Sequence, residues 1–382
     1  MTIGIDLRVL ARNARTGVEE YTINLLSRMI PLKPEIKYRF FYNAFSKTPL
    51  DFKWAELPNA EIRDFKIPNR FVFDPLARFF NLPKVDRLLG GTDVFFSPHF
   101  LLTPLSKNCR RVLTIHDLSF SHYPEFFSFS KRLWHKSLNI EKQAASAGRL
   151  IVPSRSTKAD LVNFYGVSEE KIKVIHHGVS PEFSVISEND GRLAGIKAKY
   201  RLPDKFILHL GTVEPRKNVL GLIRAFEVLK SDKNYGDLNL VIAGGLGWLY
   251  KEVLAAAKKS RFSGNIKFVP PNLPEERPYF YNLAELFVFP SFFEGFGLPI
   301  LEALACGTPV VSSNNSSLPE VLGNAGLLID PYDVEQICSA MKEILGSGEL
   351  REILIKRGLE RAKNFTWEKC AEETLEEIMS GK

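Results

Sequence analysis

The feature that most constrains the fold is a regular alternation of short apolar segments with amphipathic segments along the whole chain. The first apolar run of strand length covers residues 3–6 and the last covers residues 326–329. Many of the intervening segments carry apolar residues three and four positions apart, which is the spacing of one helix face. Strands that alternate with helices in this way predict parallel sheets covered by helices.

The expected strands form two series. The first comprises residues 3–6, 38–42, 62–65, 94–97, 112–116, 150–153 and 172–176, and the second comprises residues 206–210, 238–243, 266–269, 286–289, 309–312 and 326–329. Residues 181–192 lie between the two series, lack periodicity and predict a linker. We therefore expect two doubly wound, Rossmann-like domains, residues 1–184 and 185–365, which face each other across a ligand-binding cleft, with a C-terminal helix over 366–382 that packs back on the first.

Charge and cysteine content limit the class of protein. The 382 residues carry a net charge of +7, but residues 1–184 alone hold 27 Lys and Arg against 18 Asp and Glu, and the remainder is slightly acidic. This asymmetry predicts an anionic partner for the first half, although a solvated basic surface is the simpler alternative. The start of the chain shows no signal-peptide pattern, and the four cysteines are well separated, as in cytoplasmic proteins.

Aromatic and basic residues mix in residues 65–89. The aromatic residues include Phe71, Phe73, Phe79 and Phe80. Such a mixture can lie at a membrane interface, or the same residues can pack a helix against the sheet. We expect packing for most of the aromatic residues.

Two charged residues follow the first strand of the second series, within residues 211–218 (Gly-Thr-Val-Glu-Pro-Arg-Lys-Asn). Arg216 and Lys217 stand next to an expected helix start, where the helix dipole is already positive. A phosphate or diphosphate between them would remove this conflict, and a pair of surface charges is the alternative interpretation.

Two carboxylates flank another strand-to-helix turn, in residues 289–302 (Phe-Pro-Ser-Phe-Phe-Glu-Gly-Phe-Gly-Leu-Pro-Ile-Leu-Glu). Glu294 precedes the expected helix and Glu302 lies one turn inside it. The two glycines between them would let a ligand approach the backbone, and the helix start suits an anion. An ordinary turn without a ligand explains the same residues.

A third candidate is His116, at the carboxyl end of a strand in the first series, where an imidazole would face the expected cleft. A buried structural histidine is the alternative. The sequence contains no Gly-x-Gly-x-x-Gly, no Gly-x-x-x-x-Gly-Lys-Ser/Thr and no Asp-x-Asp, which disfavours dinucleotide oxidoreductases, P-loop enzymes and transferases that hold a metal with paired aspartates. No metal site is expected.

These motifs together resemble family 4 retaining glycosyltransferases of the GT-B fold, and the mannosyltransferases among them. The match covers residues 211–218, 290–303, 306–311 (Cys-Gly-Thr-Pro-Val-Val) and 317–321 (Ser-Leu-Pro-Glu-Val), with residues 116–118 (His-Asp-Leu) in the looser first half. The resemblance implies catalytic roles for four residues: His116 near the reacting carbon, Arg216 and Lys217 on the leaving diphosphate, and Glu294 on the sugar hydroxyls.

The resemblance also implies a set of donor-binding residues. They would contact the phosphates, the sugar or the ribose through backbone N–H groups or side chains, and they are Gly17, Thr212, Phe296, Gly297, Leu298 and Glu302. Two departures from the family pattern are residues 17–20 (Gly-Val-Glu-Glu), where more glycine and an arginine are usual, and the proline-rich residues 270–276 near the expected nucleobase.

The implied activity is retaining, metal-independent transfer of a hexose of the mannose or glucose type from a GDP or UDP sugar to a glycan or lipid-linked acceptor of a cell-surface polysaccharide. No cofactor is implied besides the donor, and no nucleic acid partner. The protein would be cytoplasmic or peripheral on the inner membrane face, where its basic half contacts an anionic surface. Alternatives are a GT-B phosphorylase or epimerase, and a non-catalytic module that binds nucleotide sugars or polyanions.

Overall fold

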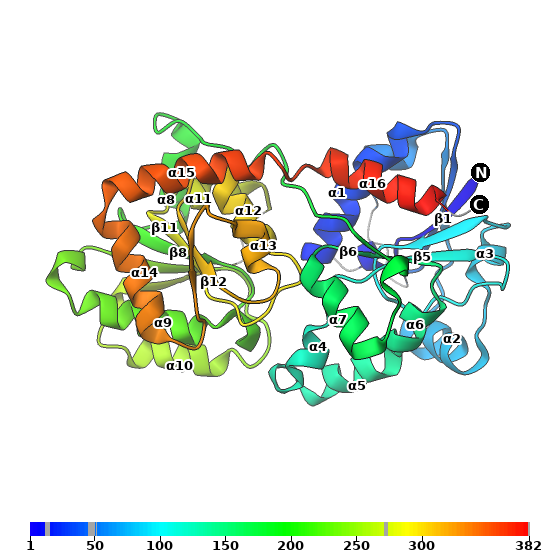
Figure 1. The fold of residues 1–382 in the computed structure, drawn as a ribbon, viewed down its shortest axis with the longest axis horizontal. Coiled ribbons are helices and arrows are strands. Elements are labelled where there is room, and N and C mark those ends of the chain that lie inside the picture. The colour runs from blue at the N-terminus through cyan, green and yellow to red at the C-terminus, as the bar shows by residue number, and fades with distance from the viewer. Residues whose placement is uncertain (12–15, 45–49, 51, 271–273, 381–382) are drawn as a thin grey trace. The chain divides into compact units, whose positions relative to one another are not determined.

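The computed structural model describes the whole chain apart from residues 12–15, 45–49, 51, 271–273 and 381–382 (Figure 1). Contacts within the chain define two compact units. The first consists of Met1–Leu118, Ser130–Gly178 and Thr366–Lys382, and the second of Ser119–Phe129 and Val179–Phe365. The contacts thus group Ser119–Phe129 with the second unit, whereas the sequence predicted residues 1–184 as one uninterrupted part of the first domain.

The first unit is built on a seven-stranded parallel sheet, with the strand order β3-β2-β1-β4-β5-β6-β7 in the described part of the chain. Its strands are β1 (Thr2–Asp6), β2 (Lys37–Tyr42), β3 (Ala60–Asp64), β4 (Val94–Ser97), β5 (Arg110–Thr114), β6 (Arg149–Val152) and β7 (Ile172–Val174). The order reverses direction between β1 and β4. Loops that follow these two strands therefore meet at the carboxyl edge of the sheet, which is the usual ligand-binding edge of an α/β domain.

Helices pack around this sheet. They are α1 (Gly17–Leu32), α2 (Asp74–Phe80), α3 (Val85–Leu88), α5 (Phe129–Leu138), α6 (Ile140–Ser146), α7 (Arg155–Tyr165) and the C-terminal α16 (Trp367–Met379). Figure 1 shows α16 beside α1. The ring of Tyr21 lies 6.2 Å from that of Trp367, and Arg28 Nε pairs with Glu368 Oε1 at 2.6 Å. The last helix is thus a structural part of the first unit.

The second unit is built on a six-stranded parallel sheet, ordered β10-β9-β8-β11-β12-β13 among the described residues. Its strands are β8 (Phe206–Leu210), β9 (Asn239–Ala243), β10 (Ile266–Val269), β11 (Leu286–Phe289), β12 (Val310–Ser313) and β13 (Leu327–Ile329). Its helices are α4 (Ser119–His122), α8 (Gly191–Tyr200), α9 (Val219–Lys230), α10 (Lys251–Lys259), α11 (Arg277–Leu283), α12 (Leu298–Ala305), α13 (Leu318–Leu322), α14 (Val334–Gly346) and α15 (Gly348–Ala362).

The core of the second unit follows from side-chain alternation along its strands. In β8, Phe206 and Leu208 join one apolar cluster, which includes residues of α11, α12 and α13, while Ile207 between them joins a second, with residues of α9, α10 and α14. Successive side chains of a strand point to opposite faces, so each strand contributes to both layers. Both faces are apolar, as expected for a parallel sheet covered by helices.

All thirteen strands expected from the sequence are present, and their ends differ from the predicted ends by no more than two residues. The helices are less well predicted. The apolar spacing of residues 131–147 is that of one continuous helix, but the helix breaks at Asn139, whose positive φ of 47° ends α5 and whose side chain caps α6. The expected linker was drawn too long, because α8 begins at Gly191 inside it, with Asp190 as its cap.

The expectation that most aromatic residues of 65–89 pack against the sheet is wrong. Of the four named phenylalanines, Phe73 alone is buried, and Phe71, Phe79 and Phe80 are 79%, 73% and 68% exposed. The short helix α2 buries Ala77 and leaves most of its surface to solvent. In the described part of the chain, no helix combines the length and apolar character needed to cross a membrane.

Candidate functional site

The carboxyl edge of the second sheet is shaped by a close backbone approach of two loops. Gly244, with φ of 142°, follows β9, and a Cβ atom there would lie 2.1 Å from the carbonyl oxygen of Gly211 after β8. Nearby, a Cβ atom at Gly247 would lie 2.7 Å from the Cγ2 methyl of Thr212. Glycine is required at these contacts because any side chain would collide with the neighbouring loop. The backbone around Thr212 is therefore held in one position.

The expected anion-binding cations are paired with carboxylates. Arg216 and Lys217 lie in a single 3₁₀ turn, Pro215–Lys217, just before α9. Arg216 Nη1 donates to Glu294 Oε2 at 2.7 Å, and Lys217 Nζ donates to Glu294 Oε1 at 2.5 Å. Arg216 also pairs with Glu214 Oε1 at 2.9 Å. Two cations thus meet two carboxylates, and the excess positive charge inferred from the sequence is balanced within the protein.

This cluster is buried, and its central carboxylate is held ionised. Glu294 is 7% exposed and Lys217 is 8% exposed. Burial alone would raise the pKa of the Glu294 carboxyl, but the adjacent Arg216 and Lys217 outweigh it and lower that pKa to about 2. An ionised carboxylate with two hydrogen-bonded cations cannot donate a proton near neutral pH. Glu294 therefore acts as a hydrogen-bond acceptor and a counter-ion.

The loop that carries Glu294 is held by residues that follow β12. The backbone N–H of Glu294 donates to Ser316 Oγ at 3.0 Å. Ser317 Oγ lies 2.9 Å from the carbonyl oxygen of Glu294 and 2.7 Å from that of Phe296. Asn315 Nδ2 donates to the carbonyl oxygen of Phe292, two residues earlier in the same loop, at 2.8 Å. These contacts explain why the Ser-Leu-Pro-Glu motif accompanies the Glu-Gly-Phe-Gly motif in this sequence.

The glycine-rich turn places the start of α12 close to this loop. Gly297 has a φ of 120°, which side chains disfavour, and no side chain caps the helix that begins at Leu298. Phe296 is buried, with its ring 5.9 Å from that of Phe365. The structure therefore brings the three expected backbone donors together at a helix N-terminus, a position that favours anions.

Glu302 lies one turn into α12 and is already engaged. Its Oε2 accepts from the Tyr281 hydroxyl at 2.8 Å and its Oε1 pairs with Arg277 Nη1 at 3.0 Å. Burial and the nearby Glu302 carboxylate raise the pKa of Tyr281, so this hydroxyl keeps its proton and donates. Sequence reasoning did not identify Arg277 or Tyr281, since neither belongs to a motif with Glu302.

Several buried polar atoms at this edge have no hydrogen-bond partner among the described residues. They are His209 Nε2, Ser291 Oγ, Ser313 Oγ and Asn315 Oδ1. They belong to the carboxyl ends of three adjacent strands, β8, β11 and β12, and to the loops that follow. Buried polar groups are nearly always satisfied in native proteins, so this group indicates a place where ligand or water supplies the missing partners.

His116 lies at the carboxyl end of β5 in the first unit. Its Nε2 lies 2.8 Å from the carbonyl oxygen of Pro98, and its ring meets Tyr21 edge-on at 4.9 Å. Burial lowers the pKa of His116, while the Pro98 carbonyl opposes this effect. A carbonyl can only accept, so the neutral ring carries its hydrogen on Nε2 and presents Nδ1 as an acceptor.

Gly17 is the first residue of α1, and Thr16 and Glu19 form a capping box there, with Thr16 N donating to Glu19 Oε2 at 3.1 Å. This pairing accounts for Glu19 in the unusual Gly-Val-Glu-Glu sequence. A Cβ atom at Gly17 would meet nothing within 4 Å. Packing within the described chain therefore does not require glycine at this position. The rest of this loop, residues 12–15, lies outside the described residues, as do residues 271–273 of the proline-rich segment.

No three His, Cys, Asp or Glu side chains gather as a potential metal site in the part of the chain that the structure describes. All four cysteines are buried and unpaired. The groups that can act through charge and hydrogen bonding at the edge of the second sheet are two cations, two buried carboxylates and a helix start without a side-chain cap.

Comparisons with known proteins agree with this arrangement. The family model described as "Glycosyl transferases group 1" matches residues 196–361, and the model "Glycosyltransferase Family 4" matches residues 15–183. The O-antigen chain mannosyltransferase B of Escherichia coli is 33% identical over 283 residues, which cover 74% of this chain and 73% of that protein.

Two solved structures share the fold. A glycosyltransferase from Rickettsia africae ESF-5 matches with a TM-score of 0.74 at 17% identity, over 100% of this chain and 99% of that one. HepE of Anabaena, solved in complex with UDP and glucose, matches with a TM-score of 0.74 at 16% identity, over 100% and 99%. Two parallel-sheet α/β units, both family models and the Escherichia coli relative point to the same enzyme class. The chain therefore belongs to the GT-B glycosyltransferases related to glycosyltransferase family 4.

Proposed function

We propose that this enzyme transfers a hexose, mannose in the first instance, from a GDP or UDP sugar to a glycan or lipid-linked acceptor during synthesis of a cell-surface polysaccharide. The similarity to an O-antigen chain mannosyltransferase supports the sugar and the pathway class. The buried cluster of Glu294, Arg216 and Lys217 supports the chemistry, because it sets two cations next to a glycine-rich helix start.

The cluster suits a leaving group that gains negative charge. Arg216 and Lys217 are held in place by Glu294 and Glu214 before any ligand binds, so they need no reorganisation when the diphosphate departs. Preorganised charges of this kind stabilise a transition state more than mobile ones. Backbone N–H groups around Phe296, Gly297 and Leu298 would add hydrogen bonds, Thr212 would lie beside the donor, and the ionised Glu294 would accept from the sugar hydroxyls.

Glu302 would contact the ribose. Its carboxylate is occupied by Tyr281 and Arg277, but each carboxylate oxygen can accept a further hydrogen bond. Within this proposal Arg277 and Tyr281 position the carboxylate for the ribose hydroxyls. Gly17 would let the first unit approach the phosphates without a side chain in the way, and His116 would offer Nδ1 to a hydroxyl near the reacting carbon.

Transfer would retain the anomeric configuration. Glu294 is a poor candidate for a nucleophile, because both of its carboxylate oxygens are hydrogen-bonded to cations. We therefore propose a front-face displacement: the acceptor oxygen bonds to the anomeric carbon, the bond to the diphosphate oxygen breaks, and the acceptor proton passes to that oxygen. Arg216 and Lys217 would replace a metal ion in this step.

The enzyme would act in the cytoplasm, at the inner face of the membrane. Four buried, unpaired cysteines fit a reducing compartment, and the basic residues 1–184 fit an anionic surface. Calorimetric titration with GDP and UDP, followed by hydrolysis of the matching sugar nucleotides, tests the donor. NMR of the first product tests retention. Sugar 1-phosphate formed from donor and inorganic phosphate, without acceptor, would show a phosphorylase instead.

A further inference from the structure

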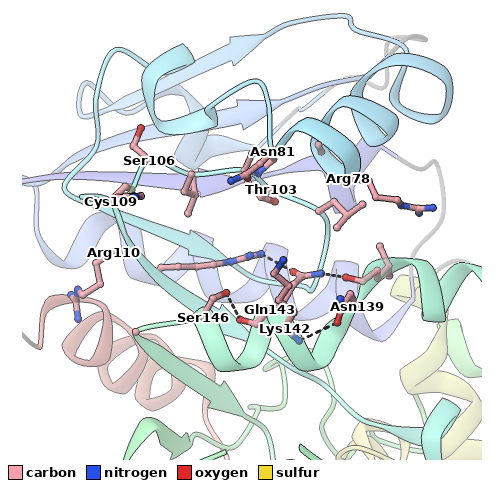
Figure 2. Close-up of a pocket in the computed structure, with 18 of the residues that line it drawn as sticks. Arg78, Asn81, Thr103, Ser106, Cys109, Arg110, Asn139, Lys142, Gln143 and Ser146 are labelled. Atoms are coloured by element: carbon pink, nitrogen blue, oxygen red, sulfur yellow. Dashed lines mark hydrogen bonds between the residues drawn. The ribbon is translucent and has the colours of Figure 1, made fainter.

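The first unit contains a basic pocket that includes none of the residues expected to bind the donor (Figure 2). It has a volume of about 880 Å³ and lies between α2, the segment that joins β4 to β5, and α5 and α6. In Figure 2, Asn81 and Thr103 face Asn139 and Gln143 across it. The size is within the range of sites for small organic ligands.

The lining of the pocket carries positive charge without negative charge. No Asp or Glu lines it, and its six basic residues are Arg78, Lys107, Arg110, Arg111, Lys136 and Lys142. Arg110 turns toward α16, where it donates to the carbonyl oxygens of Ile378 and Ser380. Four of the six are exposed at the rim and form no ion pair with a described residue: Arg78, Lys107, Lys136 and Lys142.

The half-buried Arg111 lines the pocket from β5. Arg111 Nη2 donates to Gln143 Oε1 at 2.9 Å and to the carbonyl oxygen of Leu101 at 3.2 Å, both neutral acceptors. Its Nε is buried and has no partner among the described residues. Asp6, the carboxylate that acts on Arg111 electrostatically, is paired with Arg8 at 2.6 Å.

Burial lowers the pKa of Arg111 to about 10, so this side chain still carries its charge at neutral pH. Buried charges in proteins are ordinarily paired, because an unpaired one is costly to remove from water. Ser106, in the same lining, also has a buried hydroxyl oxygen without a partner among the described residues. An anionic group in the pocket would supply both missing interactions.

The helices around the pocket expose large apolar side chains. On α2, Phe79 is 73% and Phe80 is 68% exposed, and on α5, Leu133 is 59% and Trp134 is 36% exposed. Figure 1 shows α2, α5 and α6 together on one side of the first unit. A basic cavity with an aromatic and aliphatic fringe matches a ligand with an anionic head and an apolar body.

We propose that this pocket binds the phosphorylated headgroup of an anionic membrane lipid, while the exposed aromatic residues of α2 and α5 enter the interfacial layer of the bilayer. The charge of the rim and of Arg111 complements the phosphate, and the cavity has room for the attached headgroup. The inference rests on the proposed membrane partner, but it requires neither the proposed donor nor the proposed reaction.

The test compares binding of the full chain to vesicles of phosphatidylcholine with and without phosphatidylglycerol, in the absence of sugar nucleotide. We expect strong binding to the anionic vesicles alone. The Lys136→Glu/Lys142→Glu variant should bind at least about tenfold more weakly, since basic side chains at an anionic surface each contribute substantially. A matched control, Lys53→Glu/Lys173→Glu, makes the same charge change on exposed lysines of this unit outside the pocket and should bind like the wild type.

The apolar fringe is tested separately with Phe79→Ser/Phe80→Ser, which should weaken vesicle binding, and with Val185→Ser, an exposed apolar residue of the second unit, which should not. Equal loss in the pocket variant and its charge control would overturn the pocket assignment. Binding of glycerol phosphate or inorganic phosphate without binding of vesicles would overturn the assignment of a membrane lipid as the ligand. Donor hydrolysis by the pocket variant, measured alongside, reports separately on the proposed reaction.

Discussion

Lys217 Nζ lies 2.5 Å from Glu294 Oε1, and both side chains are buried at the carboxyl edge of the second sheet. This ion pair joins the two sequence motifs that contribute the charged side chains of the site. Removal of either residue should therefore cost stability, since it leaves the other charge buried and unpaired.

Glu294→Gln should abolish transfer and also destabilise the protein by roughly 3–5 kcal/mol, the usual cost of one unpaired buried charge. Urea denaturation and initial rates measure the two effects. The double variant Lys217→Met/Glu294→Leu removes both charges, and we expect it to recover much of the stability while remaining inactive. Transfer near the wild-type rate by the double variant would contradict the role of this pair in catalysis.

Acid should destabilise the enzyme through the same carboxylate. The pKa of Glu294 falls from an ordinary 4.5 to about 2 in the folded state. A lowered pKa gives stability that is present above pH 4.5 and is lost as the pH falls toward 2. The contribution is about 3 kcal/mol, from about 1.4 kcal/mol per pKa unit. The wild type should therefore lose more unfolding free energy over this range than Glu294→Gln, measured by urea denaturation at each pH. Parallel curves would contradict the assigned shift.

His209 should affect the stability of the protein over a different pH range. Burial lowers the pKa of this histidine from an ordinary 6.5 to about 4. Stability present above pH 6.5 is lost as the pH falls from 6.5 to 4, because the unfolded chain takes up a proton on this histidine while the buried ring stays neutral. His209→Gln should flatten the stability curve there and leave the range below pH 4 unchanged. An unchanged slope between pH 6.5 and 4 would show that the ring is solvated.

Gly17→Val should lower the transfer rate at least about tenfold. Its melting temperature should change no more than that of a control variant at another helix start. The reason is that, apart from the adjacent residues and the backbone of α1 itself, nothing in the described chain lies within 4 Å of the added Cβ, so the side chain would collide with a bound ligand and not with the protein. Gly191→Val is the matched control, since Gly191 is also the first residue of a helix with open space around it. Equal transfer rates for the two variants would contradict the assignment of Gly17 to the donor site.

Ser317→Ala should loosen the loop that carries Glu294. Two backbone carbonyls lose their contact with the hydroxyl, which should cost about 1–2 kcal/mol of stability. Because the loop would hold donor less well, KM for the sugar nucleotide should rise more than kcat falls. A stability loss with unchanged KM would indicate that Ser317 supports the fold and not donor binding.

Chelation should leave the transfer rate unchanged, because Arg216 and Lys217 would meet the charge of the leaving diphosphate. The measurement compares initial rates after dialysis against EDTA with rates after addition of Mg²⁺ or Mn²⁺. Loss of activity on dialysis and its return with one of these ions would contradict the metal-independent mechanism.

The sequence predicted the strands well, since buried parallel strands read as short apolar runs between turn residues. It predicted helices less well where a local effect decided the outcome. Asn139 ends α5 through a positive φ that helical periodicity does not reveal, and Asp190 caps α8 inside a polar segment. In residues 65–89, three phenylalanines that were expected in the core, Phe71, Phe79 and Phe80, are exposed, because burial depends on the neighbouring elements and not on residue type.

The sequence also predicted that the charged motifs lie at one edge of the second sheet, but it could not predict which charged side chains form ion pairs with each other. Arg216 was interpreted as an uncompensated cation, whereas Glu294, far away in the chain, supplies its counter-charge. Tyr281 was missed as a partner of Glu302 for the same reason. Glu214 lies two residues before Arg216, and its pairing with that guanidinium depends on the local turn. Contacts between distant segments follow from the register of strands and loops, which residue types alone do not specify.

The balanced charge of the Glu294 cluster has a consequence for how ionic strength acts on the enzyme. A site with two cations and two carboxylates exerts little attraction beyond contact distance, so capture of the donor would depend on short-range hydrogen bonds. The pocket beside α2 and α6 has no carboxylate in its lining, and its field reaches further into solution. Added salt, which screens exposed charges over about 10 Å, should thus weaken attachment to an anionic surface long before it weakens binding of the sugar nucleotide.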